Sequence, residues 1–533
     1  MFELMNRAKD KLLLRSSIIH RTKFRLWNFS RLHTTLGVPI RYVGKLSTKG
    51  VIKKHKSRMR KMGRSLLPKD RYERSIEVPT QFLVLYGERT CEAARKGIQI
   101  LLNHLRIPYR KIDRSYLVSR DFGEPVVLIV LGFPWQELEH IASLCSRGTL
   151  RVIAFGSSGS YPKDMSKFKV ITADPANLLP YNEGLRSNLT CSFVNSLLEL
   201  SSFPIITGLL PPQIALRIDD VVGYKLQYLD AALDHGWVPN LGLFVEDFQP
   251  FASRIAPKFS SLAKSQMVEL SPHALTANSF LFFDYNRGKP FRFGEFSDRW
   301  VKTLRDFRAW GFPLSSVINA HFHTLSSICI SSLLDCGVRY HFSELQPDWV
   351  SMKPDVNHLP CGDPVCTTGQ SNQLGIFQVY SGDSALDCNW STSLYDFMMH
   401  VNSKDLISSI SQRIYKRLDL SLWTGFAAFI TTHENLLSNL RKFSILAIWD
   451  EVDRLMADHP LCPQKTSLSE LGRACENHTN IVVDRVEPVD NEWVVRVSGN
   501  SFGESFLTAF LEGRPHLIRL PAFKGKRDIV VRL

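Results

Sequence analysis

The stretch from Ile214 to Gly223 constrains the fold more than any other part of this sequence. Its apolar, strand-like residues are interrupted by Arg217 and end at two adjacent carboxylates, Asp219 and Asp220. Side chains alternate between the two faces of a strand, so both acids can share the open end of a sheet only where the strand finishes or bends. That edge is where α/β barrels carry their chemistry.

Two neighbouring carboxylates at such an edge can divide the work of hydrolysis. One can hold a divalent metal while the other takes a proton from metal-bound water. The alternative interpretation is structural: an Asp-Asp pair in a loop that caps the following helix.

The positive charge of the chain is concentrated at its N-terminus. Residues 1–75 contain 21 lysines and arginines against 4 acidic residues, a net charge of +17, whereas the whole chain of 533 residues carries +15. We expect a basic arm that contacts an anionic membrane surface or an acidic polymer, with a solvated extension or an organelle transit peptide as alternatives. Nucleic acid is the least favoured partner, because no aromatic and basic surface follows the arm.

The remaining composition indicates a cytoplasmic protein, with peripheral association at a membrane surface as the alternative. No apolar run reaches the ~18 residues needed to span a bilayer, and the N-terminus lacks the apolar core of a secretory signal. The ten cysteines have no regular spacing, which indicates neither a disulfide framework nor a cysteine zinc module.

The order of apolar segments predicts an α/β protein of three folded parts after the arm. Residues 80–195 are expected to form a small parallel, flavodoxin-like α/β domain, with strands at 81–86, 107–112, 126–131 and 150–155 and a helix at 90–105. Residues 205–460 are expected to form a distorted (β/α) barrel. Residues 465–533 read as a small β-rich appendage.

Several expected strands of the barrel end in histidine. His273 follows a strand at 267–270, and His433 ends a strand at 425–434. A further strand is expected at 280–285 and a helix at 436–453. His321 and His323 lie two apart in an expected strand at 316–323, so their imidazoles would face one pocket and suit zinc or a similar metal. Each histidine could instead be a hydrogen-bonded core or capping residue.

Three motifs of this region resemble the polysaccharide deacetylase superfamily, also called the NodB-homology or carbohydrate esterase family 4 fold. The segment Arg217-Ile-Asp219-Asp220 is similar to its Thr-Phe-Asp-Asp motif, and Glu269-Leu-Ser-Pro-His273 to the start of its histidine motif. Ile430-Thr-Thr-His433 is similar to its Leu-x-His motif. The sequence departs from the family at Ala277, where the second motif histidine should stand.

The resemblance implies a metal-dependent hydrolase that removes acetyl groups from a carbohydrate, with N-acetylhexosamine as the expected unit. Zn²⁺ is the expected ion, with the ligands Asp220, His273, His321 and His323 as candidates and the last two as replacements for the missing histidine. Asp219 is expected to be the base and His433 the acid. Substrate binding is predicted for Arg217, Asn319 and Trp349. The alternative is a catalytically inactive scaffold that acts through the basic arm.

Overall fold

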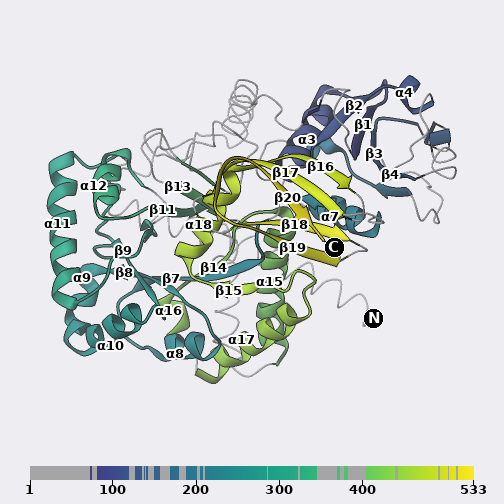
Figure 1. Cartoon of the computed structure of the whole chain (residues 1–533). Coiled ribbons are helices and arrows are strands. Elements are labelled where there is room, and N and C mark those ends of the chain that lie inside the picture. The colour runs from purple at the N-terminus through teal and green to yellow at the C-terminus, as the bar shows by residue number, and fades with distance from the viewer. Residues whose placement is uncertain are drawn as a thin grey trace, which may run out of the picture. The chain divides into compact units, whose positions relative to one another are not determined.

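The computed structural model of the chain (Figure 1) has two compact units, Met1–Met62 and Gly63–Leu533, and every residue described below lies in the second. The structure describes residues 73–74, 81–118, 126–134, 137–138, 140–141, 149–156, 168–178, 188–200, 205–207, 210–284, 286–287, 289–321, 325–344, 369–371, 377–381, 404–438, 442–489, 492–501, 503, 505–511 and 514–532. The predictions for the basic arm, His323 and Trp349 therefore lie outside the described residues. No helix in these ranges is both long and apolar enough to cross a bilayer.

The structure is a mixed α/β protein with parallel sheets, as predicted. Its first sheet has five parallel strands in the order β2-β1-β3-β4-β5, which is the order of the flavodoxin-like sheet. The strands are β1 (Phe82–Tyr86), β2 (Tyr109–Ile112), β3 (Val126–Leu131), β4 (Leu150–Phe155) and β5 (Phe168–Ile171). Helices α3 (Glu92–His104) and α7 (Asn188–Leu200) contribute buried apolar residues to the same core as this sheet.

A second parallel sheet carries the acid pair. Its strand order is β14-β7-β8-β9, with β15 also paired to β7. The strands are β7 (Gln213–Val221), β8 (Asn240–Phe244), β9 (Glu269–Ala274), β14 (Ala428–His433) and β15 (Gln464–Thr466). Helices α8 (Gln227–Asp234), α10 (Ala252–Lys264), α11 (Phe293–Trp310), α12 (Ile330–Asp335), α15 (Lys404–Thr424) and α17 (Lys442–Ala457) surround these strands (Figure 1).

A third sheet has four strands in the order β10-β11-β13-β12. Its strands are β10 (Val317–Ile318), β11 (Tyr340–Glu344), β12 (Gly369–Ser371) and β13 (Phe377–Ser381). No strand pairing links β9 to β10 among the described residues; one backbone bond, from Ser315 N–H to the Leu270 carbonyl at 2.9 Å, and two side chains of β9 join the sheets. The Ser271 hydroxyl donates to the Val317 carbonyl at 2.7 Å, and His273 Nδ1 lies 2.6 Å from the Asn319 carbonyl. The described strands thus form two sheets joined by these three bonds, and a closed barrel stays a prediction.

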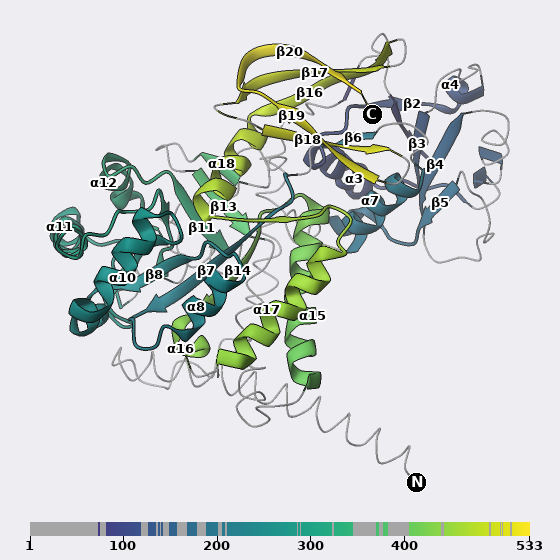
Figure 2. The same cartoon turned by 60° about the horizontal axis from the view of Figure 1, so that its bottom comes forward.

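Two antiparallel sheets of three strands follow, one above the other in Figure 2. One is β16-β17-β20, formed by Ile481–Val489, Glu492–Ser501 and Phe523–Val531. The other is β19-β18-β6, formed by Arg514–Leu520, Ser505–Leu511 and Ile205–Thr207. Apolar residues of both sheets share one core. Helix α18 (Leu468–Thr479) precedes all of these strands except β6, and it also contacts β7, β10, β12 and β13.

Two strand predictions were wrong in ways that matter for the site. The described part of the expected strand at 280–285, residues 280–284, forms no strand; Phe280, Leu281 and Phe282 are buried in a turn-rich connection. The expected strand at 316–323 is reduced to β10, two residues long, so His321 lies beyond the strand rather than on one of its faces. The predicted helix at 436–453 is divided into α16 (Glu434–Leu437) and α17.

Candidate metal centre

The backbone of β7 bends at the acid pair, as the sequence predicted. Asp220 has a φ of +57°, in the left-handed region that aspartate tolerates better than most residues. The register between β7 and β8 shifts between Ile218 and Val221, which marks a β-bulge. Bulges of this kind redirect side chains beside active sites. The helix-capping interpretation is wrong, because α8 begins only at Gln227 and has no side-chain cap.

A second bulge redirects the first histidine. On β9, Pro272 pairs with Leu243 and Ala274 with Phe244, so His273 is the extra residue between them. Its ring turns toward Asp220, and its Nε2 lies 3.3 Å from Asp220 Oδ1. Each of the two bulges therefore supplies one member of the site.

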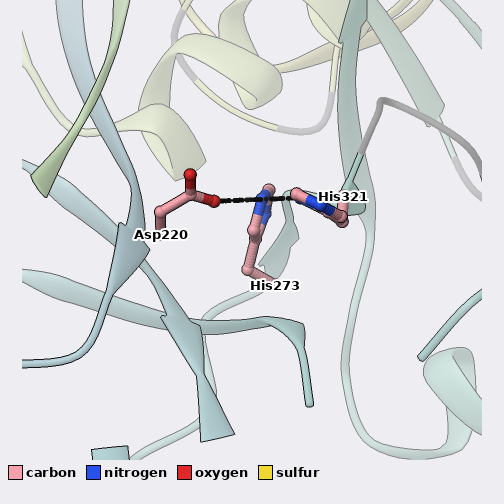
Figure 3. Close-up of side chains that lie close together, drawn as sticks. All are labelled: Asp220, His273 and His321. Atoms are coloured by element: carbon pink, nitrogen blue, oxygen red, sulfur yellow. Dashed lines mark hydrogen bonds and ion pairs between the residues drawn. The ribbon is translucent and has the colours of Figure 1, made fainter. Parts of the chain in front are cut away.

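His321 completes a cluster with Asp220 and His273, and Figure 3 shows the His273 ring between the other two side chains. His321 Nδ1 lies 2.8 Å from His273 Nε2 and 3.8 Å from Asp220 Oδ1. Metal–nitrogen and metal–oxygen bonds of about 2.0–2.1 Å in a tetrahedron place two ligand atoms roughly 3.3 Å apart. The three observed separations lie on both sides of that value, so one small cation fits between the three atoms.

Hydrogen bonding prepares His273 and Asp220 to be ligands. His273 Nδ1 must carry a proton to bond the Asn319 carbonyl, so the lone pair of Nε2 faces the cluster, where it lies 2.8 Å from His321 Nδ1. Metal-binding histidines commonly have this second bond. Because Nε2 has no proton to donate, Asp220 Oδ1 is buried without a hydrogen-bond donor among the described residues. A cation bound here would contact both the buried Asp220 Oδ1 atom, which has no hydrogen-bond donor among the described residues, and the lone pair of His273 Nε2.

Asp219 is held apart from the cluster by an ion pair with Arg217. Arg217 Nε donates to Asp219 Oδ1 at 2.9 Å, Nη2 lies 2.5 Å from Oδ2, and Nη1 donates to the Phe342 carbonyl at 3.1 Å. Burial alone would raise the pKa of Asp219, but the Arg217 guanidinium and His273 outweigh it and lower the pKa well below its usual range. Asp219 is therefore an anion at every physiological pH.

Glycine allows Asp219 to come this close to the cluster. A Cβ at Gly242 on β8 would lie 2.7 Å from Asp219 Oδ1 and 3.3 Å from the His273 Cβ. Both separations are below ordinary van der Waals contact, so any side chain at this position would displace the site.

Burial and neighbouring residues set the charges of two candidate ligands, Asp220 and His321. Burial opposes ionisation of Asp220, but the neighbouring His273, His433 and His321 rings outweigh it and lower its pKa. Burial lowers the pKa of His321 to about 3, and His273 contributes to the shift. His321 is therefore neutral near pH 7 and has a lone pair for a metal. Phe280 stacks on the His321 ring, with 5.7 Å between the ring centroids.

His433 lies at the open side of the cluster. It ends β14, is in register with Asp219 on β7, and places Nε2 3.9 Å from Asp220 Oδ2. About a quarter of its side chain (26%) is exposed, against 19% for Asp220 and 3% for Asp219 and His273, so His433 is the most exposed member of the set.

Glu434, which the sequence did not single out, fixes the chain that follows the acid pair. It is buried and accepts hydrogen bonds from the backbone N–H groups of Val222 and Gly223 and from the Tyr228 hydroxyl. Burial raises its pKa. The only sequence signal for Glu434 was its position directly after His433.

The structure brings together Asp219, Asp220, His273, His321 and His433 from four separate segments of the chain. Arg217 and Asn319 lie behind them: both are fully buried, and their polar groups bond Asp219 and Asn240 rather than an open surface. Ala277 is exposed in the connection after β9. Asn240 and Gly242 are further residues of the site that the sequence analysis missed.

No protein-family model and no curated protein matches this sequence. The chain is remotely similar to solved polysaccharide deacetylases over about half of its length. A Mycobacterium smegmatis protein assigned to the polysaccharide deacetylases has 10% identity, a TM-score of 0.35, and coverage of 50% of this chain and 91% of the other. A family 4 carbohydrate esterase from Streptomyces lividans has 10% identity, a TM-score of 0.25, and coverage of 46% and 90%. A peptidoglycan N-acetylglucosamine deacetylase has 12% identity, a TM-score of 0.29, and coverage of 52% and 95%.

Proposed function

We propose that the protein is a metal-dependent hydrolase that removes acetyl or similar acyl groups from a carbohydrate containing N-acetylhexosamine. One observation carries the proposal: Asp220, His273 and His321 converge on a single point with Asp219 and His433 beside them. The acyl-sugar class of substrate comes from the motifs at Asp219–Asp220 and His433.

The three converging residues would hold the cation through Asp220 Oδ1, His273 Nε2 and His321 Nδ1. One carboxylate and two imidazoles are a donor set typical of catalytic zinc, which keeps a fourth position open. The same donor set binds Fe(II) in other proteins, so identifying the ion is part of the test. A bound Zn²⁺ supplies Lewis acidity, which lowers the pKa of water and polarises an acyl carbonyl.

Asp219 is the proposed general base. Arg217 keeps it ionised and fixes its orientation, so the carboxylate is always able to accept the proton of an attacking water. The same ion pair makes Asp219 a weak base, which suits proton transfer only from a strongly acidified water. Arg217 thus acts as a positioning residue and not, as the sequence suggested, as a residue that touches substrate.

His433 is the proposed general acid. It is the most exposed of the site histidines, and its Nε2 approaches Asp220 Oδ2, whereas His321 approaches Oδ1. A leaving amine or hydroxyl that approaches from solvent would meet this imidazole first. A histidine near its ordinary pKa of ~6.5 can give a proton close to neutral pH.

A cavity beside the cluster offers room for sugar. Phe280 contacts His321 with one face of its ring and also lines a cavity of about 500 Å³, a size typical of small-molecule sites. The other lining residues include amides and charged groups suited to hydroxyl recognition, among them Asn278, Asn286, Glu295, Asp298 and Arg299.

Acetate release from N-acetylglucosamine oligomers by the zinc-loaded protein tests the function. We expect Asp219→Asn to abolish release while the bound metal stays in place, because Asp219 lies outside the cluster of ligands. Unchanged turnover in Asp219→Asn would remove this residue from the mechanism. A wild-type protein that binds metal and releases no acetate from any acylated sugar would favour the inactive scaffold instead.

A further inference from the structure

A continuous chain of hydrogen bonds, buried at the candidate metal centre and partly buried at Glu269, runs from that centre to the N-terminus of α18. His273 Nδ1 donates to the Asn319 carbonyl at 2.6 Å, and Asn319 Nδ2 donates to Asn240 Oδ1 at 2.6 Å. Asn240 Nδ2 then donates to Glu269 Oε2 at 3.1 Å, and the Ser469 backbone N–H donates to Glu269 Oε1 at 3.2 Å. Asn240 and Asn319 have no exposed surface.

Each bond of this chain has a direction, and Glu269 sets it. Both oxygens of the Glu269 carboxylate accept, so Asn240 must turn its Nδ2 toward Glu269 and its Oδ1 away. The Oδ1 atom then accepts from Asn319 Nδ2 at 2.6 Å. If Asn240 were reversed, its amide would face the Asn319 amide donor to donor.

At the metal centre, the chain of hydrogen bonds ends at His273 and fixes the nitrogen of this ring that faces the metal. Asn319 immediately follows β10, and its side chain is anchored by Asn240, so its backbone carbonyl is held where His273 Nδ1 can donate to it. This bond decides which nitrogen of His273 carries the proton. The other nitrogen, Nε2, is the atom that faces Asp220 and His321.

At its other end, the chain of hydrogen bonds joins Glu269 to Ser469, which lies 200 residues later in the sequence. Glu269 accepts from the backbone N–H of Ser469, in the first turn of the twelve-residue helix α18, where a carboxylate is favoured by the helix dipole. A purely structural role for Glu269 would end there, as an anchor for α18. The bond to Asn240 goes beyond that role.

We propose that Glu269 is a positioning residue for the metal centre: anchored by α18, it orients Asn240 and, through Asn319, selects the tautomer and the orientation of the His273 ring. The inference rests on the proposed function for the identity of the centre. It assigns to α18, which lies beyond the segment carrying the site residues, a part in holding that centre.

The test compares Glu269→Met with a swap variant. Glu269→Met keeps the volume but removes both acceptors, so Asn240 loses the bond that fixes its orientation. The swap Asn240→Asp/Glu269→Gln rebuilds the chain: the new amide donates to the new carboxylate, whose second oxygen still accepts from Asn319. Glu476→Gln, which alters the bond from Tyr340 to the same helix, is the control for loosening of α18.

We measure Zn²⁺ and Co²⁺ affinity by competition with a chromogenic chelator, together with the visible spectrum of the Co²⁺ protein. Substitution of a residue that supports a metal ligand through hydrogen bonds typically lowers metal affinity about 10–100-fold. We expect a loss in that range for Glu269→Met with an altered Co²⁺ spectrum, recovery in the swap variant to within about threefold of wild type, and little change in Glu476→Gln. Wild-type affinity in Glu269→Met, or an equal loss in Glu476→Gln, would overturn the proposal.

A metal-free readout separates this inference from the proposed function. In protein labelled with ¹⁵N-histidine, the His273 Nδ1 proton should give an exchange-protected resonance that disappears in Glu269→Met and returns in the swap variant. If that pattern holds while wild type binds no metal, the metal centre is wrong and the positioning role stands. If the resonance survives in Glu269→Met, the positioning role is wrong whatever the metal does.

Discussion

The Arg217–Asp219 pair gives the sharpest prediction on stability. Both side chains are almost completely buried, and three polar contacts hold the guanidinium in place. Removing one partner of such a pair leaves an uncompensated buried charge, which costs about 3–5 kcal/mol. Arg217→Met should therefore reduce the free energy of unfolding by that amount at pH 7, which corresponds to a drop in Tm on the order of 10 °C.

The pH dependence of this loss identifies its cause. The pKa of Asp219 is lowered in the folded protein, so the pair stabilises the fold above the unfolded value of ~3.9 and loses its effect as pH falls through the folded value. In Arg217→Met the unpaired carboxyl is easier to protonate. The difference in Tm between wild type and Arg217→Met should therefore shrink as the pH is lowered from 7 toward 4.

The double variant Arg217→Met/Asp219→Leu is the matched control, because it replaces both charges with apolar side chains. Such replacements of whole buried pairs are commonly neutral or stabilising. We expect the double variant to recover most of the loss, measured by thermal unfolding at pH 7 and pH 4. A single variant as stable as wild type at pH 7, or a loss that is independent of pH, would refute this account of the pair.

Three further predictions follow from the same geometry. Gly242→Ala should weaken metal binding and lower Tm because its Cβ would press on Asp219 and His273, whereas Gly294→Ala, with open space around its Cβ, should do neither; equal behaviour of the two would contradict the close packing. His433→Gln should lower turnover by roughly 10²–10⁴-fold with the metal retained, and His321→Gln should lose metal and turnover together; metal retained in His321→Gln would exclude His321 as a ligand. Because burial lowers the pKa of His321 to about 3, the metal-free protein should lose stability as pH falls from 6.5 toward 3, and a slope in urea titrations that is unchanged by His321→Gln would contradict that burial.

Local sequence patterns predicted the parts of this site that depend on one strand. The apolar run before Asp219 and Asp220 identified β7, and the requirement that both acids share one edge predicted the bend found at Asp220. The strand ending at His433 was also correct. These features follow from side-chain alternation within a single segment.

Features that depend on packing between distant segments were beyond such patterns. The turn-rich segment with Phe280 and Phe282 was predicted as a strand because an apolar run reports burial and not backbone pairing. His321 was expected on a strand face, but it reaches the cluster because Ser271 and His273 join β9 to the segment around β10. The roles of Asn240 and Glu269 require partners that only the folded chain supplies.

The most direct test of the account is an anomalous-scattering measurement on crystals grown with zinc. A single peak should lie within about 2.0–2.2 Å of Asp220 Oδ1, His273 Nε2 and His321 Nδ1. An ordered crystal in which these three side chains are visible and no anomalous peak lies between them would contradict the metal centre, and with it the proposed hydrolase.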